Sequence, residues 1–147
     1  MKRILPPTLF LICSIAMLLL HLLLPLHSII GFPSSLVGMV LLIFGLGISV
    51  WGSSVFARLG TPVKTFEQPR RLVTYGLFRY SRNPMYLGFV LALLGIALAL
   101  GTLSPLLGVA FFFLVADRGY IPYEETMLAQ KFGRDFQAYQ AQTRRWL

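Results

Sequence analysis

The chain has 147 residues, of which 56% are hydrophobic and 12% are charged, and its formal net charge is +8. Soluble domains carry about 25% charged residues, so this composition excludes an ordinary soluble domain and indicates a protein embedded in a lipid bilayer. A spanning helix needs about 20 mostly apolar residues, and such runs account for most of the chain.

The first apolar run covers residues 5–26, contains no charged residue and follows Lys2 and Arg3. A basic start before a leucine-rich run also occurs in secretory signal peptides, but their apolar region is usually about 7–15 residues long and ends at a small-x-small cleavage site. This run is longer and no such site follows it. We therefore expect a membrane helix over residues 5–26.

Three further apolar runs predict helices over residues 34–56, 84–100 and 105–121. Pro84 suits the first position of a helix, because proline brings no N–H and has a preset φ. The sequence GTLSP between the third and fourth runs is typical of a tight turn. The third and fourth runs are therefore predicted to form a helical hairpin.

After the fourth run the apolar pattern becomes amphipathic. Leu128, Phe132, Phe136 and Tyr139 recur at helical spacing, and Gly133 interrupts them. Such a pattern is typical of a helix that lies along the membrane interface. The predicted fold is a single all-α integral membrane domain over residues 1–147. It has about four transmembrane helices, a cytoplasmic loop over residues 57–83 and a cytoplasmic amphipathic tail over residues 122–147.

The charged residues predict how the helices are oriented. The 13 Lys and Arg residues lie in the N-terminal tip, in the loop over residues 57–83 or after Ala116, and the two opposite loops carry no formal charge. The positive-inside rule then predicts that both termini and the long loop are cytoplasmic. Topology and attraction to anionic lipid headgroups explain the basic balance, so no nucleic-acid partner is expected.

Two of the apolar runs carry a stripe of small residues at helical spacing. The stripes are Gly38, Gly45, Ser49 and Gly52 in the second run, and Gly88, Ala92, Gly95 and Ala99 in the third. Helices in lipid associate through such faces because their backbones approach closely there. The stripes predict close helix packing, either within one bundle or across a homodimer.

The few other polar residues narrow the chemistry by exclusion. Cys13 is the single cysteine, so an internal disulfide and a CxxC pair are absent. His21 and His27 have no acidic or thiol residues near them in the sequence, and no metal site is expected. The chain also lacks a phosphate-binding GxxxxGK loop and a GxSxG nucleophile elbow.

Two polar clusters remain, over residues 70–86 and 117–140. Both should lie at the same membrane face, because the helical hairpin returns the chain to the side from which it started. Arginines of the first cluster complement Glu124 and Glu125 of the second. The alternative is that the arginines only reach toward headgroups, while the tyrosines form an interfacial aromatic belt.

Taken together, the strings YGLFRYSRNPMYLG and EETMLAQKFGRDFQAYQAQTRRW resemble the isoprenylcysteine carboxyl methyltransferase and phospholipid methyltransferase family of integral membrane enzymes. The resemblance covers residues 69–147, whereas the first two helices match only as hydrophobic spans. Leu77 stands where the family usually has proline, and Asn83 stands where histidine is usual.

The resemblance implies a methyltransferase that binds S-adenosylmethionine in a pocket at the cytoplasmic ends of the last helices, capped by the C-terminal tail. The residues that it assigns to the cofactor are Tyr75, Gly76, Arg79, Arg82, Asn83, Pro84, Tyr86, Glu124 and Glu125. Glu124, Glu125 and Arg118 are the candidate catalytic residues. The carboxylates could act as a base for an amine acceptor, and Arg118 or Asp117 could orient the polar head of the acceptor.

The acceptor is expected to be lipophilic because the site would lie at a membrane. A prenylated cysteine carboxylate, a phospholipid amine, a small thiol and an isoprenoid acid all remain open as acceptors. Two other functions also remain open. One is an NADPH-dependent membrane reductase related to sterol reductases, and the other is a non-enzymatic scaffold that binds membrane lipids.

Overall fold

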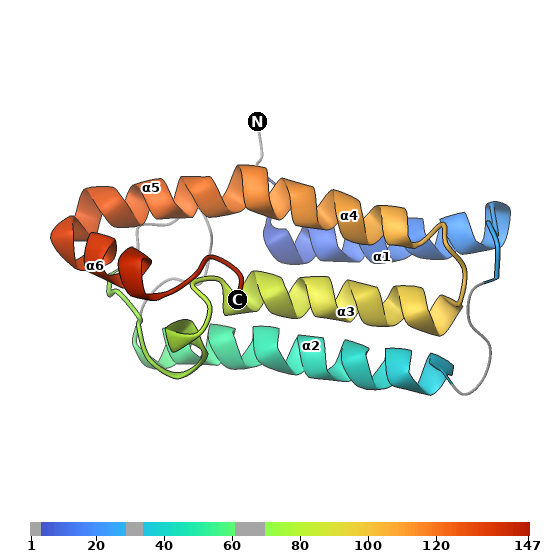
Figure 1. Cartoon of the computed structure of the whole chain (residues 1–147), viewed down its shortest axis with the longest axis horizontal. Coiled ribbons are helices and arrows are strands. Elements are labelled where there is room, and N and C mark those ends of the chain that lie inside the picture. Colours follow the sequence, from blue (N-terminus) through green and yellow to red (C-terminus); the bar gives the residue numbers. More distant parts are fainter. Residues whose placement is uncertain (1–3, 29–33, 61–69) are drawn as a thin grey trace.

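The computed structural model describes residues 4–28, 34–60 and 70–147, which form helices joined by turns and loops (Figure 1). The helices are α1 (Pro6–Leu23), α2 (Ser34–Arg58), the 3₁₀ turn η1 (Gly76–Arg79), α3 (Pro84–Leu100), α4 (Leu106–Val115), the π-helical turn η2 (Ala116–Tyr120), α5 (Ile121–Phe132) and α6 (Arg134–Gln142). The described residues form no β-strand, only two isolated bridges. The predicted all-α fold is therefore confirmed for these residues. Lys2, Arg3 and part of the predicted 57–83 loop lie outside them.

The first helix ends earlier than the sequence predicted. α1 stops at Leu23 and not at residue 26, and Leu24 leaves the helix with φ −138° and ψ 66°. Pro25 explains the difference, because the ring of a proline disfavours the helical conformation of the residue before it.

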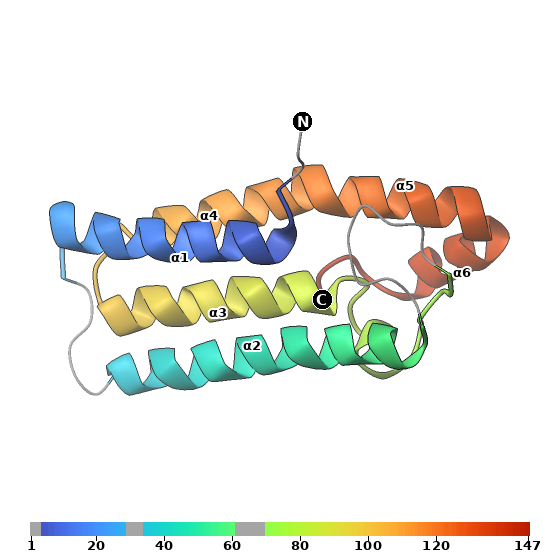
Figure 2. The same ribbon diagram turned by 180° about the vertical axis from the view of Figure 1, so that it is seen from behind.

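α3 begins at Pro84 and ends at Leu100, as predicted. Gly101 closes the helix in the left-handed conformation, with φ 72° and ψ 12°, which a residue without a Cβ adopts readily. α3 lies in the middle of the molecule, with α2 on one side and α1 and α4 on the other (Figures 1 and 2). α1, α2 and α4 therefore each pack against α3.

The predicted end of the fourth helix at residue 121 is wrong. α4, η2 and α5 continue as one helix of 27 residues, Leu106–Phe132. Pro122 has no N–H and its ring crowds the preceding turn, but the turn before it is widened. The Ile121 N–H donates to the carbonyl of Ala116, five residues earlier. This π-helical turn lets the chain pass the proline without leaving the helix.

The long helix breaks at Gly133, as the sequence predicted. This glycine has φ 48° and ψ −114°, and α6 starts directly after it. α6 folds back from the end of α5 toward η1 and the start of α3 (Figure 1). The C-terminal residues therefore return to the first polar cluster.

The small-residue stripes of α2 and α3 face each other, so the predicted close packing is confirmed within one chain. A Cβ added to Gly45 would lie 2.5 Å from both the Ala92 backbone nitrogen and the Gly88 carbonyl oxygen. A Cβ on Gly95 would lie 2.4 Å from the Leu42 backbone nitrogen. The two backbones touch directly, which only glycine permits at these positions.

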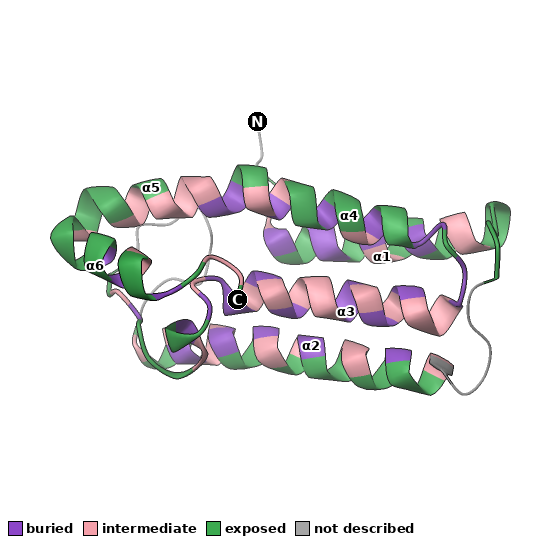
Figure 3. Cartoon of the chain, viewed as in Figure 1, coloured by how far each residue is buried: buried purple, intermediate pink, exposed green. Residues whose placement is uncertain are grey.

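A second apolar core lies between α1, α3 and α4. Met17 and Phe112 are 0% exposed there, and Cys13 is buried beside them as a packing residue. The outer faces of α1, α2 and α4 carry exposed leucine, isoleucine, valine and phenylalanine side chains (Figure 3). α1, α2 and the continuous Leu106–Phe132 helix are long and apolar enough to span a membrane. α3 is apolar but only 17 residues long, so a fourth span stays an expectation.

Candidate functional site

The described residues form a cleft where α2 ends and α3 begins. The cleft has a volume of about 90 Å³ and is partly open to the outside. Its walls come from the end of α2, from η1, from the first turn of α3, and from α5 and α6. The lining residues are Phe56, Phe78, Arg82, Asn83, Pro84, Met85, Tyr86, Glu124, Glu125, Leu128, Phe136 and Tyr139.

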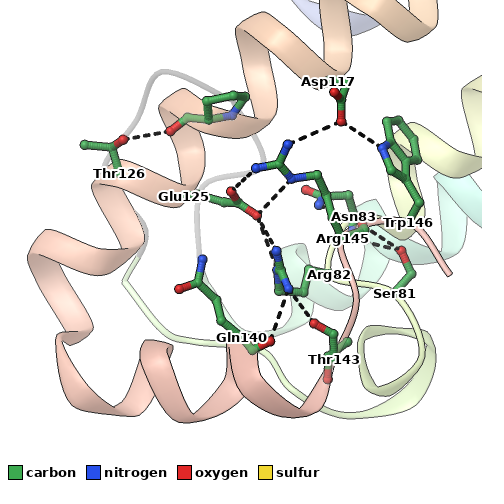
Figure 4. Close-up of polar contacts among 11 residues, drawn as sticks. Ser81, Arg82, Asn83, Asp117, Glu125, Thr126, Gln140, Thr143, Arg145 and Trp146 are labelled. Atoms are coloured by element: carbon green, nitrogen blue, oxygen red, sulfur yellow. Dashed lines mark hydrogen bonds and ion pairs between the residues drawn. The ribbon is translucent and has the colours of Figure 1, made fainter.

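The two polar clusters of the sequence meet in this cleft through an ion pair. Arg82 Nη2 lies 2.7 Å from Glu125 Oε1, and Arg82 Nε donates to the same oxygen at 3.3 Å (Figure 4). The side chains of Arg82 and Glu125 are 13% and 14% exposed. The complementary charges that the sequence predicted are therefore paired in a largely desolvated position.

Arg145, near the C-terminus, is a second cation on Glu125, and the sequence did not single it out. Its Nη2 lies 2.7 Å from Glu125 Oε2, and its Nη1 lies 3.3 Å from Asp117 Oδ1. The hydrogen bond to Glu125 raises the pKa of Arg145 above its usual value, although partial burial opposes the shift. Arg145 thus joins η2 to α5 across about two turns of the long helix (Figure 4).

The backbone of the C-terminal segment also contacts the first cluster. The Arg82 N–H donates to the Arg144 carbonyl at 2.9 Å, and Asn83 Nδ2 donates to the Arg145 carbonyl at 3.0 Å. Arg82 Nη1 donates to the carbonyls of Thr143 and Gln140. Most of the donor capacity of Arg82 is therefore used within the protein.

Trp146, next to Arg145, also contacts the long helix. Its Nε1 donates to Asp117 Oδ1 at 2.9 Å, and its ring stacks on Phe113 with centroids 4.8 Å apart. The last residues of the chain are thus held against the long helix by one aromatic contact and one hydrogen bond to a carboxylate.

Glu124 occupies a different part of the cleft from Glu125. Tyr86 donates its hydroxyl to Glu124 Oε1 at 2.8 Å, and the Tyr86 ring stacks on Tyr120 with centroids 6.0 Å apart. Tyr120 in turn donates to the carbonyl of Ile4 at the start of the chain. Glu124 and Tyr86 thus form a polar pair backed by a buried aromatic layer.

Tyr139 links α6 to η1 on the opposite wall. Its hydroxyl donates to the Phe78 carbonyl at 2.5 Å, and the side chain is buried. Burial raises the pKa of Tyr139 to about 12. The hydroxyl therefore stays protonated at neutral pH and keeps donating this bond.

The structure divides the predicted site residues into two groups. Six of them line the cleft: Arg82, Asn83, Pro84, Tyr86, Glu124 and Glu125. The other four lie outside it: Tyr75, Gly76, Arg79 and Arg118.

The residues outside the cleft have other surroundings. Tyr75 is 54% exposed, and Gly76 has φ +63° and packs closely on Trp51. Arg79 is exposed, and its carbonyl accepts the Thr143 hydroxyl at 3.4 Å. The Arg118 side chain is 82% exposed and pairs with the neighbouring Asp117 at 3.4 Å.

Several cleft residues were not predicted from sequence. Phe56 precedes the first polar cluster, and Phe78 lies within it. Leu128, Phe136 and Tyr139 belong to the predicted amphipathic face. The helical spacing of these last three residues was visible in the sequence, but it indicated a helix face that lies on the membrane interface. The structure turns part of that face toward the protein.

A bundle of long apolar helices with exposed apolar side chains defines the class of integral membrane proteins. Comparison with known families narrows this class further. The chain belongs to the phospholipid methyltransferase family, whose pattern matches residues 33–135.

Individual relatives agree with this membership. A rice protein described as a probable protein-S-isoprenylcysteine O-methyltransferase is 37% identical over 110 residues, which cover 71% of this chain and 56% of the rice protein. Protein-S-isoprenylcysteine O-methyltransferase B of Arabidopsis thaliana is 38% identical over 77 residues, 50% of this chain and 37% of that protein. An uncharacterized protein of Haemophilus influenzae is 44% identical over 63 residues, 43% of this chain and all of that protein. This chain therefore spans about half the length of the rice relative. No solved structure matches it.

Proposed function

We propose that the protein transfers a methyl group from S-adenosylmethionine to a lipophilic acceptor at the cytoplasmic face of a membrane. The observation that carries this proposal is the meeting of two distant polar clusters in one cleft, at the end of a helix bundle with an apolar surface. Family membership supports the reaction class. The positions of the basic residues support the cytoplasmic side for the cleft and for both termini.

The chemistry of the cleft fits the methyl donor. S-adenosylmethionine supplies an electrophilic methyl group on a sulfonium and also carries an ammonium, a carboxylate, a ribose diol and an adenine ring. Glu124 offers a carboxylate for the ammonium or the ribose hydroxyls, and the apolar walls include the rings of Phe56 and Phe136. Aromatic faces bind both planar rings and cations.

Arg82 and Glu125 are proposed to shape the cleft. Because Arg82 already donates to Glu125 and to two backbone carbonyls, it has little capacity left for a ligand carboxylate. Glu125 accepts from two arginines. We assign the direct donor contact to Glu124 and Tyr86, which line the same cleft and are hydrogen-bonded to each other.

Methyl transfer is an in-line displacement, so the protein mainly has to align the acceptor with the methyl group and exclude water. A carboxylate or thiolate acceptor would need no general base, whereas a protonated amine would, and Glu124 is the candidate. The names of the plant relatives favour a prenylcysteine-like carboxylate. Arg118 lies on the outer surface, where it could orient the polar head of an acceptor that arrives from the lipid.

A thermal-shift experiment on the detergent-purified protein tests the donor. S-adenosylhomocysteine at about 100 times its dissociation constant should stabilise the fold by about 2.7 kcal/mol, and NADPH should have no effect. Stabilisation by NADPH alone would indicate a reductase, and stabilisation by neither would leave a lipid-binding scaffold.

A matched pair of variants tests the assignment of Glu124. Glu124→Gln keeps an acceptor for the Tyr86 hydroxyl but removes the negative charge, so affinity for S-adenosylhomocysteine should fall about tenfold. Asp135→Asn makes the same chemical change at an exposed position on α6 and should bind normally. Equal affinities would remove Glu124 from the site. Transfer of a labelled methyl group to lipid-soluble material would then identify the acceptor.

A further inference from the structure

The C-terminal segment, residues 143–146, does not line the cleft itself but contacts Arg82, Asn83 and Glu125 in its wall. It runs beside residues 81–83, where Ser81 and Arg144 form an isolated parallel bridge. Arg82 donates its N–H to the Arg144 carbonyl, and Ser81 donates its hydroxyl to the Arg145 carbonyl at 3.4 Å. The C-terminal segment takes part in these two hydrogen bonds only through backbone carbonyls, so its side chains did not indicate them.

Asn83 provides the side-chain contact at the centre of this pairing. It is 7% exposed, and its Nδ2 donates to the Arg145 carbonyl at 3.0 Å. The carbonyl is an acceptor only, so the contact requires a donor on residue 83. Without the Asn83 donor, the part-buried carbonyl would keep only the longer bond from the Ser81 hydroxyl at 3.4 Å, and the lost hydrogen bond would weaken the docking of the segment.

Arg145 fixes the same segment through its side chain. It binds Glu125 at 2.7 Å and Asp117 at 3.3 Å, and it shares Glu125 with Arg82. Arg82 in turn donates to the Thr143 carbonyl. Arg82, Glu125 and the C-terminal segment thus form one closed network, as Figure 4 shows.

We propose that Asn83 and Arg145 are positioning residues, which dock the C-terminal segment onto the start of α3 and so hold the Arg82–Glu125 pair in the wall of the cleft. The docking itself follows from the contacts above. The consequence for donor affinity rests on the proposed function, because the network borders Glu124 and Tyr86 in the same cleft.

The first experiment compares two neighbouring arginines. Arg145→Met removes both carboxylate contacts, whereas Arg144→Met changes an exposed side chain whose residue contributes through its backbone. Amide hydrogen exchange in the peptide over residues 140–147 measures docking directly. Arg145→Met should speed this exchange and weaken S-adenosylhomocysteine binding, each by about tenfold. Arg144→Met should change neither.

The second experiment tests the donor role of residue 83. Asn83→Leu has a similar volume but no donor, and it should reproduce the faster exchange and about tenfold weaker binding. Asn83→His restores an N–H donor and should bring both measurements back toward those of the unchanged protein. A residue that merely filled space would be replaced better by leucine than by histidine.

The outcomes separate the two proposals. Amide exchange in Arg145→Met as slow as in the unchanged protein would overturn the positioning role. Slower exchange and tighter S-adenosylhomocysteine binding in Asn83→Leu than in Asn83→His would overturn it as well. Faster exchange with unchanged affinity would also overturn it, because docking would not affect the cleft. If the unchanged protein binds no S-adenosylhomocysteine, the proposed function and the affinity half of this inference fail together, while exchange still decides whether Asn83 and Arg145 dock the segment.

Discussion

α3 is held in one way along most of its length and in another way at its N-terminus. Along most of its length, α3 contacts α2 backbone to backbone through glycines. At its N-terminus the neighbouring residues 81–83 are held by ion pairs and hydrogen bonds to α5 and to the C-terminal segment. Inside a bilayer helices gain little from apolar burial, so close packing has to stabilise them. At the cleft, ion pairs and hydrogen bonds between side chains take the place of this packing.

The largest effect is expected at the glycine contact between α2 and α3. Gly45→Ala would bring a Cβ to 2.5 Å from the backbone of α3, and such overpacking should destabilise the fold by about 3 kcal/mol. Gly47 is exposed on the same helix with nothing within 4 Å of its would-be Cβ. Gly47→Ala should therefore be neutral or stabilise by up to about 1 kcal/mol. Thermal unfolding in detergent measures both variants, and equal destabilisation would contradict the packing seen here.

At the cleft, Glu125→Gln should destabilise the protein by about 2 kcal/mol, because it leaves two desolvated arginines without their shared carboxylate. This figure is below the range for fully buried pairs, since Arg145 is 35% exposed. The exposed Asp135→Asn serves as the charge-matched control. If both variants unfold at the same temperature, the ion-pair network contributes nothing to the fold.

A smaller effect is expected from Tyr139→Phe. This variant removes the hydroxyl that donates to the Phe78 carbonyl at 2.5 Å and should cost about 1 kcal/mol. Tyr80 is 68% exposed, and Tyr80→Phe should leave the unfolding temperature unchanged. A loss of stability in Tyr80→Phe as large as that in Tyr139→Phe would show that the buried bond is not what matters.

The smallest effect is expected at Arg118. Its side chain is 82% exposed and its pair with Asp117 is long, at 3.4 Å, and exposed pairs of this kind contribute little. Arg118→Gln should unfold like the unchanged protein and should bind S-adenosylhomocysteine normally. An increase only in the KM for the lipophilic acceptor would support a role in orienting that acceptor, whereas weaker donor binding would contradict its position outside the cleft.

Several local features were predictable because each depends on residues close together in the chain. Pro84 set the start of α3, Gly101 its end and Gly133 the break before α6. The helix end expected at residue 121 was wrong, since a widened turn can accommodate Pro122. That widening depends on backbone geometry, which a hydropathy pattern does not reveal.

The cleft was predictable only in part. The charges of Arg82 and Glu125 indicated that the two clusters meet, and the structure pairs them at 2.7 Å. Arg145 was not singled out, because a basic residue near the end of a membrane protein is commonplace. Tyr75 and Arg79 were assigned to the site from the motif, but they lie outside the cleft. Adjacency in a motif therefore does not ensure adjacency in space.

The sequence by itself determined the all-helical fold, the small-residue faces of α2 and α3, and the two polar clusters, because composition and periodicity act locally along each helix. Only the tertiary structure decided which members of those clusters line one cleft, and that the last residues of the chain contact its wall. One reason is that part of this docking uses backbone carbonyls, which every residue carries. The other is that the carboxylate partners of Arg145 lie 20 and 28 residues away in the chain, beyond the reach of any local pattern.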